Sequence, residues 1–328
     1  MHRYDNQNRS MPMPGRVALS TLAVIVPVHD GGDDIEQCLC ATGPGHDAIT
    51  VVDDSSSDGS AEAAARRHAI RYLMLARAEL GRTHGAAAAR NAGAATIRDE
   101  AEWLIFVDAD VVLRADAIWR FAALFKAEPD IAAAFGSYDD TPRHPDWINR
   151  YKNLLHHRTH QLGAREAATF WSGCGAARRD VFEACGGFDA GMTGATIEDI
   201  EFGVRLRDAG HRIVLERDIQ CTHLKRWTFA SWLRTDIFGR ALPWSRLLMR
   251  RGRGLPDTLN LGLRERLSAV LVCSVLLAVL LVLLPGMPGG PLLIVALCSA
   301  WSRRCGCSAR CWASSQDRAG QALSWRPH

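Results

Sequence analysis

Two aspartates follow one of the longest apolar stretches in the first half of the chain. Residues 103–107 (Trp-Leu-Ile-Phe-Val) are apolar without a break and lead into Asp108-Ala109-Asp110. Such a run predicts a buried parallel strand, and ligands of open α/β sheets bind at the carboxyl ends of such strands. In an extended chain Asp108 and Asp110 point the same way, and two adjacent carboxylates repel each other unless a cation lies between them. Oxygen ligands favour Mg²⁺ or Mn²⁺, with coordination sites left over for phosphate groups.

The same aspartates also fit a simpler structural interpretation. Asp110 precedes Val111-Val112-Leu113 and a helical stretch that we expect from about Arg114. Aspartate is common in turns and as a helix N-cap, because its side chain accepts hydrogen bonds from the first free backbone N–H groups. The pair alone therefore fits either a metal site or a cap.

The elements that must position these acids alternate along the first half of the chain. We expect strands at residues 22–28, 48–52, 70–75, 103–107 and 131–136, with helices from about Asp33, at 61–68 and at 85–95. Strands alternating with helices predict right-handed parallel crossovers and a doubly wound sheet. No Gly-x-Gly-x-x-Gly follows the first strand, which argues against a nicotinamide cofactor.

The second half is less regular. A helix is expected at 145–162, with Trp147, Tyr151, Leu154 and Leu155 at helical spacing and the histidines 156, 157 and 160 on its solvated face. A strand at 170–176 contains glycines where the backbone approaches another group closely. After a short helix at 178–185, a helix at 198–210 begins with Glu198 and Asp199, and a strand follows at 212–221. Acids in a first helical turn are also explained by the helix dipole alone.

Composition limits the class of protein. The 328 residues are 48% hydrophobic and 23% charged, which is a globular balance, and the net charge of +3 is too small to indicate nucleic-acid binding. The ten cysteines form no disulfide framework, and Cys38, Cys40, Cys174, Cys185 and Cys221 are scattered as in reduced cytosolic proteins. Cys305, Cys307, Cys311 and His328 match no zinc spacing. Residues 1–20 are polar, lack the apolar core of a signal peptide and are expected to form a disordered leader.

The C-terminal third indicates a membrane. Residues 227–249 mix aromatic side chains with arginines at broadly helical spacing, which fits interfacial helices on an anionic surface or a buried helical hairpin. Residues 267–284 carry no charge and are preceded by Arg264 and Arg266, which predicts a membrane span entered from the cytosol. We expect a domain at 21–226, interfacial helices at 227–262, one or two transmembrane segments at 263–302, and an irregular tail at 303–328 such as a truncation or frame shift would leave.

Six segments in this order resemble the inverting family 2 glycosyltransferases of the membrane-associated bacterial type. They are Val-Ile-Val-Pro-Val (24–28), Asp-Asp-Ser-Ser-Ser-Asp-Gly-Ser (53–60), Ala-Arg-Asn-Ala-Gly (89–93), Asp-Ala-Asp (108–110), Glu-Asp (198–199) and His-Leu-Lys-Arg-Trp (223–227). The resemblance implies an α/β fold of the GT-A type, a Rossmann-like doubly wound mixed sheet, followed here by amphipathic and transmembrane helices. It also implies sugar transfer from a nucleotide-sugar with inversion at the anomeric carbon.

The resemblance assigns roles to individual residues. Asp110 and His223, with Asp108, would hold Mg²⁺ or Mn²⁺. Asp199 matches the general base, and its neighbour Glu198 would alter its proton affinity. The residues expected at the donor are Pro27, Val28, Asp53, Asp54, Arg90, Asp108, Gly173, Arg226 and Trp227. Arg226-Trp227 resembles the end of the Gln-x-x-Arg-Trp motif of processive synthases, but His223 stands where that motif has glutamine, so processive action is not implied.

The sequence therefore predicts a glycosyltransferase at the cytoplasmic membrane, with its catalytic domain facing the cytosol. The donor would be a UDP- or GDP-sugar, and the acceptor a lipid carrier, a glycolipid or a polysaccharide. Two alternatives remain at this point: a non-catalytic GT-A-like module that binds nucleotide-sugars or acts as a scaffold, and a nucleotidyltransferase, which also uses carboxylates and metal on an α/β sheet. Only the glycosyltransferase requires a base at Asp199.

Overall fold

The computed structural model describes residues 21–42, 48–77, 83–97, 101–192 and 197–251, with residues 267, 270–272, 274 and 275. The chain divides into two units, Met1–Leu259 and Asn260–His328, and the sheet with its helices belongs to the first. The expected leader, the tail with its cysteines and most of the predicted membrane segment at 263–302 lie outside the described residues. Within the described ranges, no helix is both long and apolar enough to span a membrane.

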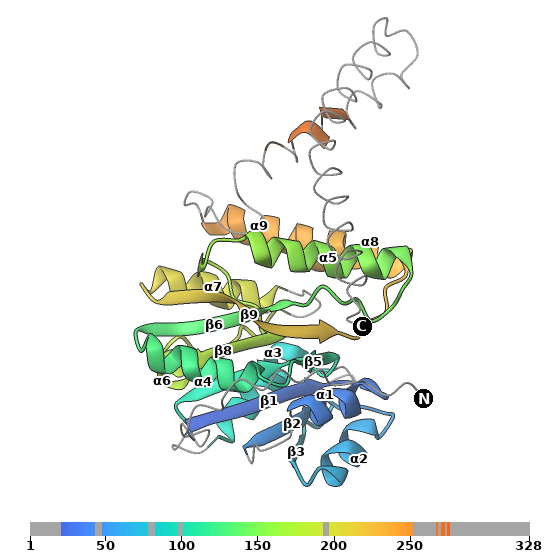
Figure 1. Ribbon diagram of the computed structural model, residues 1–328, viewed down its shortest axis with the longest axis vertical. Coiled ribbons are helices and arrows are strands. Elements are labelled where there is room, and N and C mark those ends of the chain that lie inside the picture. The colour runs from blue at the N-terminus through green and yellow to red at the C-terminus, as the bar shows by residue number, and fades with distance from the viewer. Residues whose placement is uncertain are drawn as a thin grey trace, which may run out of the picture. The chain divides into compact units, whose positions relative to one another are not determined.

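The N-terminal half alternates strands and helices as the sequence predicted (Figure 1). Its elements are β1 (Leu22–Val28), α1 (Asp34–Thr42), β2 (Ile49–Asp53), α2 (Ser60–Arg67), β3 (Arg71–Met74), α3 (Ala86–Ala95) and β4 (Trp103–Val107). The four strands lie in the order β3-β2-β1-β4 and are all parallel. Since β1, β2 and β4 are buried along their whole length, their carboxyl ends lead from the core directly into one edge of the sheet.

The remaining elements extend the same sheet. They are β5 (Val111–Leu113), α4 (Ala117–Ala127), β6 (Ile131–Tyr138), α5 (Trp147–Leu162), β7 (Glu166–Ala167), β8 (Cys174–Arg178), α6 (Arg179–Ala184), α7 (Glu198–Asp208), β9 (Arg212–His223), α8 (Phe229–Arg234), the π-helix η3 (Thr235–Ala241) and α9 (Leu242–Arg251). The full order is β3-β2-β1-β4-β8-β6-β9-β5, with β7 also paired to β9. β8 runs antiparallel to both neighbours, and β5 and β7 run antiparallel to β9. The predicted mixed α/β sheet is therefore confirmed.

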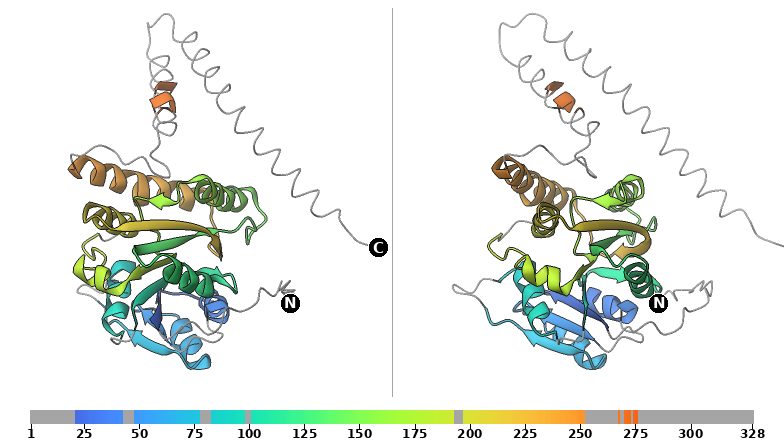
Figure 2. Two further views of the ribbon diagram at one scale, coloured as in Figure 1. Left: turned by 60° about the vertical axis from the view of Figure 1, so that its left-hand side comes forward. Right: turned by 90° about the vertical axis from the view of Figure 1, so that its left-hand side faces the viewer.

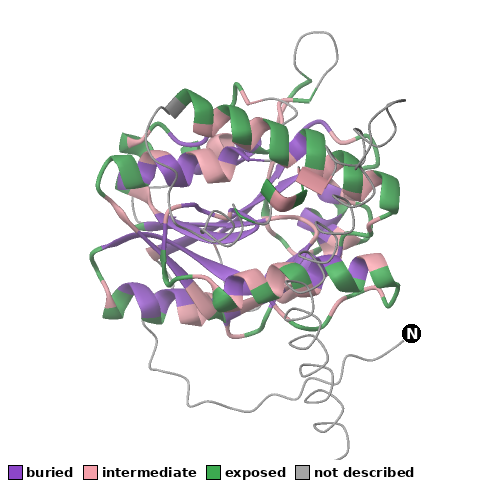
Figure 3. Ribbon diagram, turned by 90° about the horizontal axis from the view of Figure 1, so that it is seen from above, coloured by how far each residue is buried: buried purple, intermediate pink, exposed green. Residues whose placement is uncertain are grey.

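Helices cover both faces of the sheet (Figure 2). On one face α1, α2 and α4 contribute buried side chains such as Ile35 and Phe121. On the other, α3, α6 and α7 pack on the strands, and Phe106 of β4 lies 5.4 Å from Phe182 of α6 between ring centroids. Seen from above, burial follows the strands and the inner faces of the helices, while the outer faces are exposed (Figure 3). The sheet is thus a rigid support for the loops at its edge.

Beside the aspartate pair, the structure rules out the cap interpretation that the sequence left open and corrects one predicted strand. Val111–Leu113 form a strand paired to β9, and the next helix begins only at Ala117 with Asp116 as its N-cap, so Asp110 does not cap a helix. The strand expected at 170–176 begins instead at Cys174, and residues 170–173 form a loop. In that loop the Trp171 ring fills the space beside Gly173, where a Cβ would lie 2.7 Å from the ring.

Helix α5 turns its polar face inward and its apolar face outward, the reverse of the prediction. Its buried residues are polar, Asn149, Lys152, Asn153 and His160, whereas Trp147, Tyr151, Leu155 and Leu162 are exposed. The predicted solvated histidine face is wrong. His160 is buried beside the rings of Phe135, Tyr138 and Trp171, and burial lowers its pKa to about 4. Tyr151 and Trp147 contact Trp232 of α8, so α5 and α8 form one layer with apolar side chains outside.

Candidate functional site

A cleft of about 560 Å³ opens at the carboxyl ends of β1, β2 and β4. This is the place where open α/β sheets bind ligands, and the volume suits a nucleotide-sized molecule. Most residues expected from the sequence to act in the site line it: Pro27, Val28, Asp54, Arg90, Asp108, Asp110, Glu198, Asp199, His223 and Trp227. Asp53, Gly173 and Arg226 are not in its lining.

Asp54 anchors the entrance to α3. Its carboxylate accepts hydrogen bonds from the backbone N–H groups of His84 (2.9 Å) and Gly85 (2.7 Å). Gly85 has a φ of 90°, which glycine adopts without the steric cost that a side chain would add. Its neighbour Asp53 points away from the cleft and binds the Tyr72 hydroxyl (2.7 Å) and the Ser56 N–H (2.7 Å). Asp53 therefore shapes the loop, and Asp54 is the member of the pair that borders the cleft.

Arg90 of α3 links two of the acidic motifs. One terminal nitrogen lies 2.6 Å from Asp108 Oδ1 and the other 2.8 Å from Glu198 Oε1. The guanidinium is buried, and its two carboxylate partners raise its pKa although burial acts against the charge. Since Glu198 begins α7 and Asp108 directly follows β4, this one side chain fixes the position of α7 relative to the sheet. Glu198 Oε2 is buried and has no hydrogen-bond partner among the described residues.

Asp110 faces His223 across the mouth of the cleft. The imidazole Nε2 lies 3.7 Å from Asp110 Oδ1, and β5 pairs with β9 so that Val111 lies opposite His223. Asp34, at the first turn of α1, borders the same space, and burial together with the charge of Asp110 raises its pKa. A carboxylate and an imidazole facing each other, with a second acid nearby, fit a divalent cation that keeps open sites. The Lys225 N–H donates to His223 Nδ1 (3.2 Å), so coordination through Nε2 would require the other tautomer.

Asp199 lies on the α7 side of the cleft. One oxygen accepts hydrogen bonds from the Ser172 N–H (3.1 Å) and hydroxyl (3.4 Å), and the other accepts from the Ile200 N–H (2.8 Å). Burial, followed by the charge of Glu198, raises the pKa of Asp199 to about 7, although Arg90 and the Ser172 N–H lower it. A carboxyl with this pKa can accept a proton near neutral pH. The charge of Glu198 therefore adds to burial in raising the proton affinity of Asp199.

The two remaining expected residues have other places. Gly173 lies behind the cleft, where its carbonyl accepts the Asp108 N–H (3.2 Å), and this hydrogen bond holds the end of β4. Arg226 is exposed outside the lining. Sequence reasoning missed Ser172, whose contact with Asp199 depends on the loop before β8, and Lys225 and Arg240, which add positive charge to the cleft wall. For Lys225 a signal existed, because it lies within the His-Leu-Lys-Arg-Trp segment.

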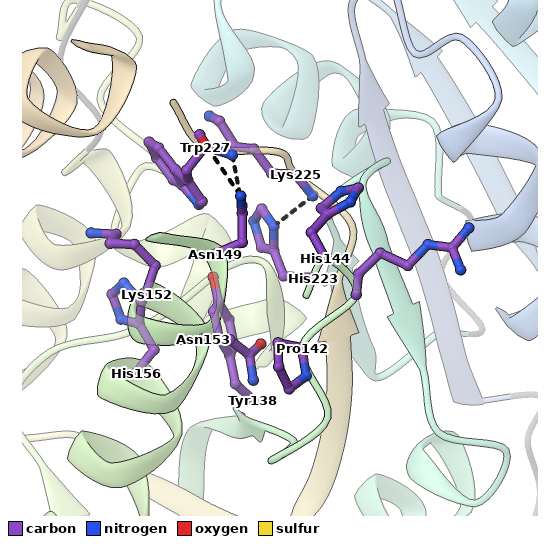
Figure 4. A pocket seen from close by; sticks show the side chains of 11 residues that line it. Tyr138, Pro142, His144, Asn149, Lys152, Asn153, His156, His223, Lys225 and Trp227 are labelled. Atoms are coloured by element: carbon purple, nitrogen blue, oxygen red, sulfur yellow. Dashed lines mark hydrogen bonds between the residues drawn. The ribbon is translucent and has the colours of Figure 1, made fainter. Parts of the chain in front are cut away.

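A small pocket adjoins the cleft on the α5 side and shares Tyr138, His223, Lys225 and Trp227 with it (Figure 4). Asn149 of α5 accepts from the Trp227 N–H (2.7 Å) and donates to the Trp227 carbonyl (3.1 Å). The ammonium groups of Lys152 and Lys225 lie 5.2 and 4.7 Å from the Trp227 ring centroid. The inward polar face of α5 therefore positions Trp227 beside the cleft.

Comparisons with known proteins identify the family and the fold. Residues 23–186, half of the 328 residues, match the model of the family described as glycosyl transferase family 2. Among solved structures, the chain is similar to the mannosyltransferase PcManGT from Pyrobaculum calidifontis in complex with GDP-Man and Mn²⁺. The TM-score is 0.55 at 19% identity, over 93% of this chain and 80% of that one. No curated protein sequence matches. The structural likeness supports the expected GT-A fold, and the family match shows that the chain belongs to glycosyl transferase family 2 and is a glycosyltransferase.

Proposed function

We propose that this protein transfers a sugar from a UDP- or GDP-sugar to a membrane-associated acceptor, with inversion and with Asp199 as the general base. The observation that carries the proposal is one cleft that contains Asp54, the Asp110–His223 pair and a carboxyl whose pKa is raised to about 7. Asp54 would contact the nucleotide base, the Asp110–His223 pair would hold a cation at the phosphates, and Asp199 would remove the acceptor's proton. The reaction requires these three functions.

We propose that Asp199 takes the acceptor's proton. Inversion by a single displacement requires one base on the acceptor side, opposite the leaving group. Ser172 and the first turn of α7 hold the carboxylate in one orientation, so little rearrangement is needed when the hydroxyl arrives. We do not assign this role to Glu198, because it is largely buried and its Oε1 is paired with the Arg90 guanidinium. Its proposed role is to keep the proton affinity of Asp199 high.

Asp110 and His223 are the residues that would hold Mg²⁺ or Mn²⁺. When bound there, the cation would supply charge neutralisation for the nucleoside diphosphate that leaves. Asp108 Oδ1 pairs with Arg90, so we propose that Asp108 contributes less to the cation than Asp110 and also keeps the loop in place. The similar mannosyltransferase was solved with GDP-Man and Mn²⁺, which supports a nucleotide-sugar and a divalent cation here as well.

Donor specificity is tested by thermal stabilisation of the full chain. UDP, GDP and their sugar conjugates would be added with Mn²⁺, with Mg²⁺ or with a chelator, and the melting temperature recorded. We expect one nucleotide class to raise the melting temperature, and only with a divalent cation, since binding to the folded state alone stabilises it. Stabilisation that is equal with and without the cation would contradict the proposed role of Asp110 and His223.

Membrane association is supported by the outer surface of the α5–α8–α9 layer. Phe229, Phe238, Leu242 and Met249 are exposed on α8, η3 and α9, with arginines 234, 246 and 250 among them. Because these apolar side chains are exposed, residues 227–249 do not form the buried helical hairpin that was the alternative. Apolar side chains mixed with arginines are typical of a surface that rests on an anionic membrane, where each arginine contributes about 1 kcal/mol.

The strength of attachment distinguishes two modes. The full chain should remain in the membrane pellet through a carbonate wash, because burying about eighteen apolar residues outweighs the arginine contribution. A chain ending near Arg264 should bind anionic vesicles only at low salt. If the full chain washes off as readily as the shortened one, residues 267–284 do not anchor the protein and the membrane contact is peripheral.

A further inference from the structure

Three side chains with metal-binding chemistry converge outside the cleft, between α1 and α2. Glu36 and Cys40 lie one turn apart on α1, and His68 follows the last residue of α2. His68 Nε2 lies 3.0 Å from Glu36 Oε1 and 3.8 Å from Cys40 Sγ, and Cys40 Sγ lies 3.9 Å from the same glutamate oxygen. None of the three lines the cleft. Among the described residues, this is the group of three such side chains whose ligand atoms all lie within 4.8 Å of one another.

The spacing of these atoms is that of a tetrahedral zinc site. Zinc binds histidine nitrogen and carboxylate oxygen at about 2.1 Å and thiolate sulfur at about 2.3 Å, so tetrahedral angles separate N from O by roughly 3.4 Å and S from either by roughly 3.6 Å. The observed separations of 3.0, 3.8 and 3.9 Å differ from these values by a few tenths of an ångström. Small side-chain rotations would therefore bring all three atoms to one ion.

The surroundings orient one of the three ligands and partly shield two of them from water. Arg67 donates to Glu36 Oε2 at 2.6 Å, which leaves Oε1 directed at His68. The side chains of His68 and Glu36 are about three-quarters and two-thirds buried, at 23% and 30% exposure, so they are partly shielded from water. Cys40 is exposed and completes the group from the outside. A supporting partner that orients a metal-binding carboxylate is a regular feature of zinc sites.

We propose that Glu36, Cys40 and His68 bind Zn²⁺, with a water molecule in the fourth position. A thiolate and an imidazole are ligands for Zn²⁺ and poor ones for Mg²⁺ or Mn²⁺, so this site and the cleft take different ions. Binding requires the thiol to lose its proton and His68 to present Nε2 as a lone pair, which means the tautomer with hydrogen on Nδ1. The net change at neutral pH is one Zn²⁺ bound and one proton released from Cys40. The ion would cross-link α1 to the end of α2.

The test is a titration of the full-length protein with Co²⁺ and Zn²⁺ under reducing conditions. Co²⁺ substitutes for Zn²⁺ and gives a thiolate charge-transfer band, so the band reports on a cysteine ligand rather than on the cleft, whose described lining contains no cysteine. We expect one equivalent of Co²⁺ to produce the band in the wild type, and we expect Zn²⁺ to displace this Co²⁺ and remove the band. Cys40→Ser should lose that equivalent and the band, while Cys185→Ser, a matched change at another incompletely buried thiol, should keep both.

His68→Ala separates a three-ligand site from a lone reactive thiol. Losing a direct ligand should weaken Zn²⁺ binding by more than the roughly 10- to 100-fold that loss of an outer partner costs. The proposal is overturned if the wild type and Cys40→Ser give the same band and stoichiometry, or if His68→Ala binds Zn²⁺ as tightly as the wild type. Folding of each variant is checked by its melting temperature in chelator, where none should differ greatly from the wild type.

Discussion

Replacing Asp199 by asparagine should abolish transfer and change how stability depends on pH. Burial and Glu198 raise the pKa of Asp199 from 3.8 to about 7 in the folded protein. A carboxyl with a raised pKa destabilises the fold as pH rises, because the unfolded state releases the proton first. The full shift corresponds to about 4 kcal/mol at 1.36 kcal/mol per pKa unit. Asp199 keeps part of its surface open to the cleft, so water screens its charge. We therefore expect Asp199 to lower the free energy of unfolding of the wild type by about 1–2 kcal/mol between pH 5 and pH 8.

The asparagine variant also loses stability at every pH, because one hydrogen bond is lost. The carboxylate of Asp199 accepts from Ser172 on one oxygen and from Ile200 on the other, and an asparagine side chain has only one acceptor oxygen. Losing one of these hydrogen bonds costs about 1 kcal/mol at every pH. At any single pH the variant can therefore be more or less stable than the wild type. We predict that its free energy of unfolding, relative to the wild type, increases from pH 5 to pH 8.

Urea unfolding at three pH values measures this difference, with Asp218→Asn as the control because Asp218 is exposed on β9. The control should show no such trend. Nucleotide binding by Asp199→Asn should be nearly intact, since the proposed cation and base contacts lie elsewhere in the cleft. If the stability difference between Asp199→Asn and the wild type does not depend on pH, the pKa of Asp199 is not raised. If the variant still transfers sugar, Asp199 is not the base.

Three further predictions concern the residues around Asp199. Asp110→Asn should remove cation-dependent nucleotide binding, and Asp108→Asn should weaken it less; nucleotide titration with and without Mn²⁺ compares them, and equal effects would contradict Asp110 as the ligand. Arg90→Lys should lower the free energy of unfolding by about 1.5–3 kcal/mol in urea, because one ammonium cannot span both carboxylates, whereas Arg66→Lys in the exposed pair with Glu62 should cost under about 0.5 kcal/mol. Gly203→Ala should destabilise by about 1–3 kcal/mol in the same assay and reduce transfer, since its Cβ would lie 2.3 Å from the Phe170 backbone nitrogen; wild-type activity would show that α7 can shift without disturbing Asp199.

The regular elements of the domain could be predicted from sequence because their signals are local. β1 and β4 are unbroken apolar runs, and both predicted ranges agree with the structure. β8 was predicted to begin too early because Phe170 and Trp171 favour a strand. The loop at 170–173 is instead fixed by distant groups: Phe170 packs on Phe202 of α7, and Ser172 binds Asp199. Local periodicity contains no information about such partners, so strand boundaries that depend on them cannot be predicted from it.

The candidate site was predictable to the extent that it follows from motifs. The sequence places Asp54, Asp110 and Asp199 after strands or at the first turn of a helix, and the structure brings all three to one cleft. What the motifs did not indicate is the bridge between them. Arg90 was expected to support the nucleotide, but its contacts to Asp108 and Glu198, 18 and 108 residues away along the chain, depend on how α3 and α7 pack. Long-range pairing of charges requires the fold to be known first.

The reversed face of α5 explains both an error of sequence reasoning and a property of the molecule. Helical periodicity identifies an apolar stripe and assigns it to the core, because fully burying a large apolar side chain contributes about 1.5–3 kcal/mol. In α5 the stripe of Trp147, Tyr151 and Leu155 faces outward, and the inward side is polar because it supports Trp227 at the cleft and forms an ion pair between Lys152 and Asp236 of η3. Several large apolar side chains left in water are unfavourable for the isolated domain. Contact with a membrane through this same face would recover that free energy, and it would hold the cleft next to a lipid-borne acceptor.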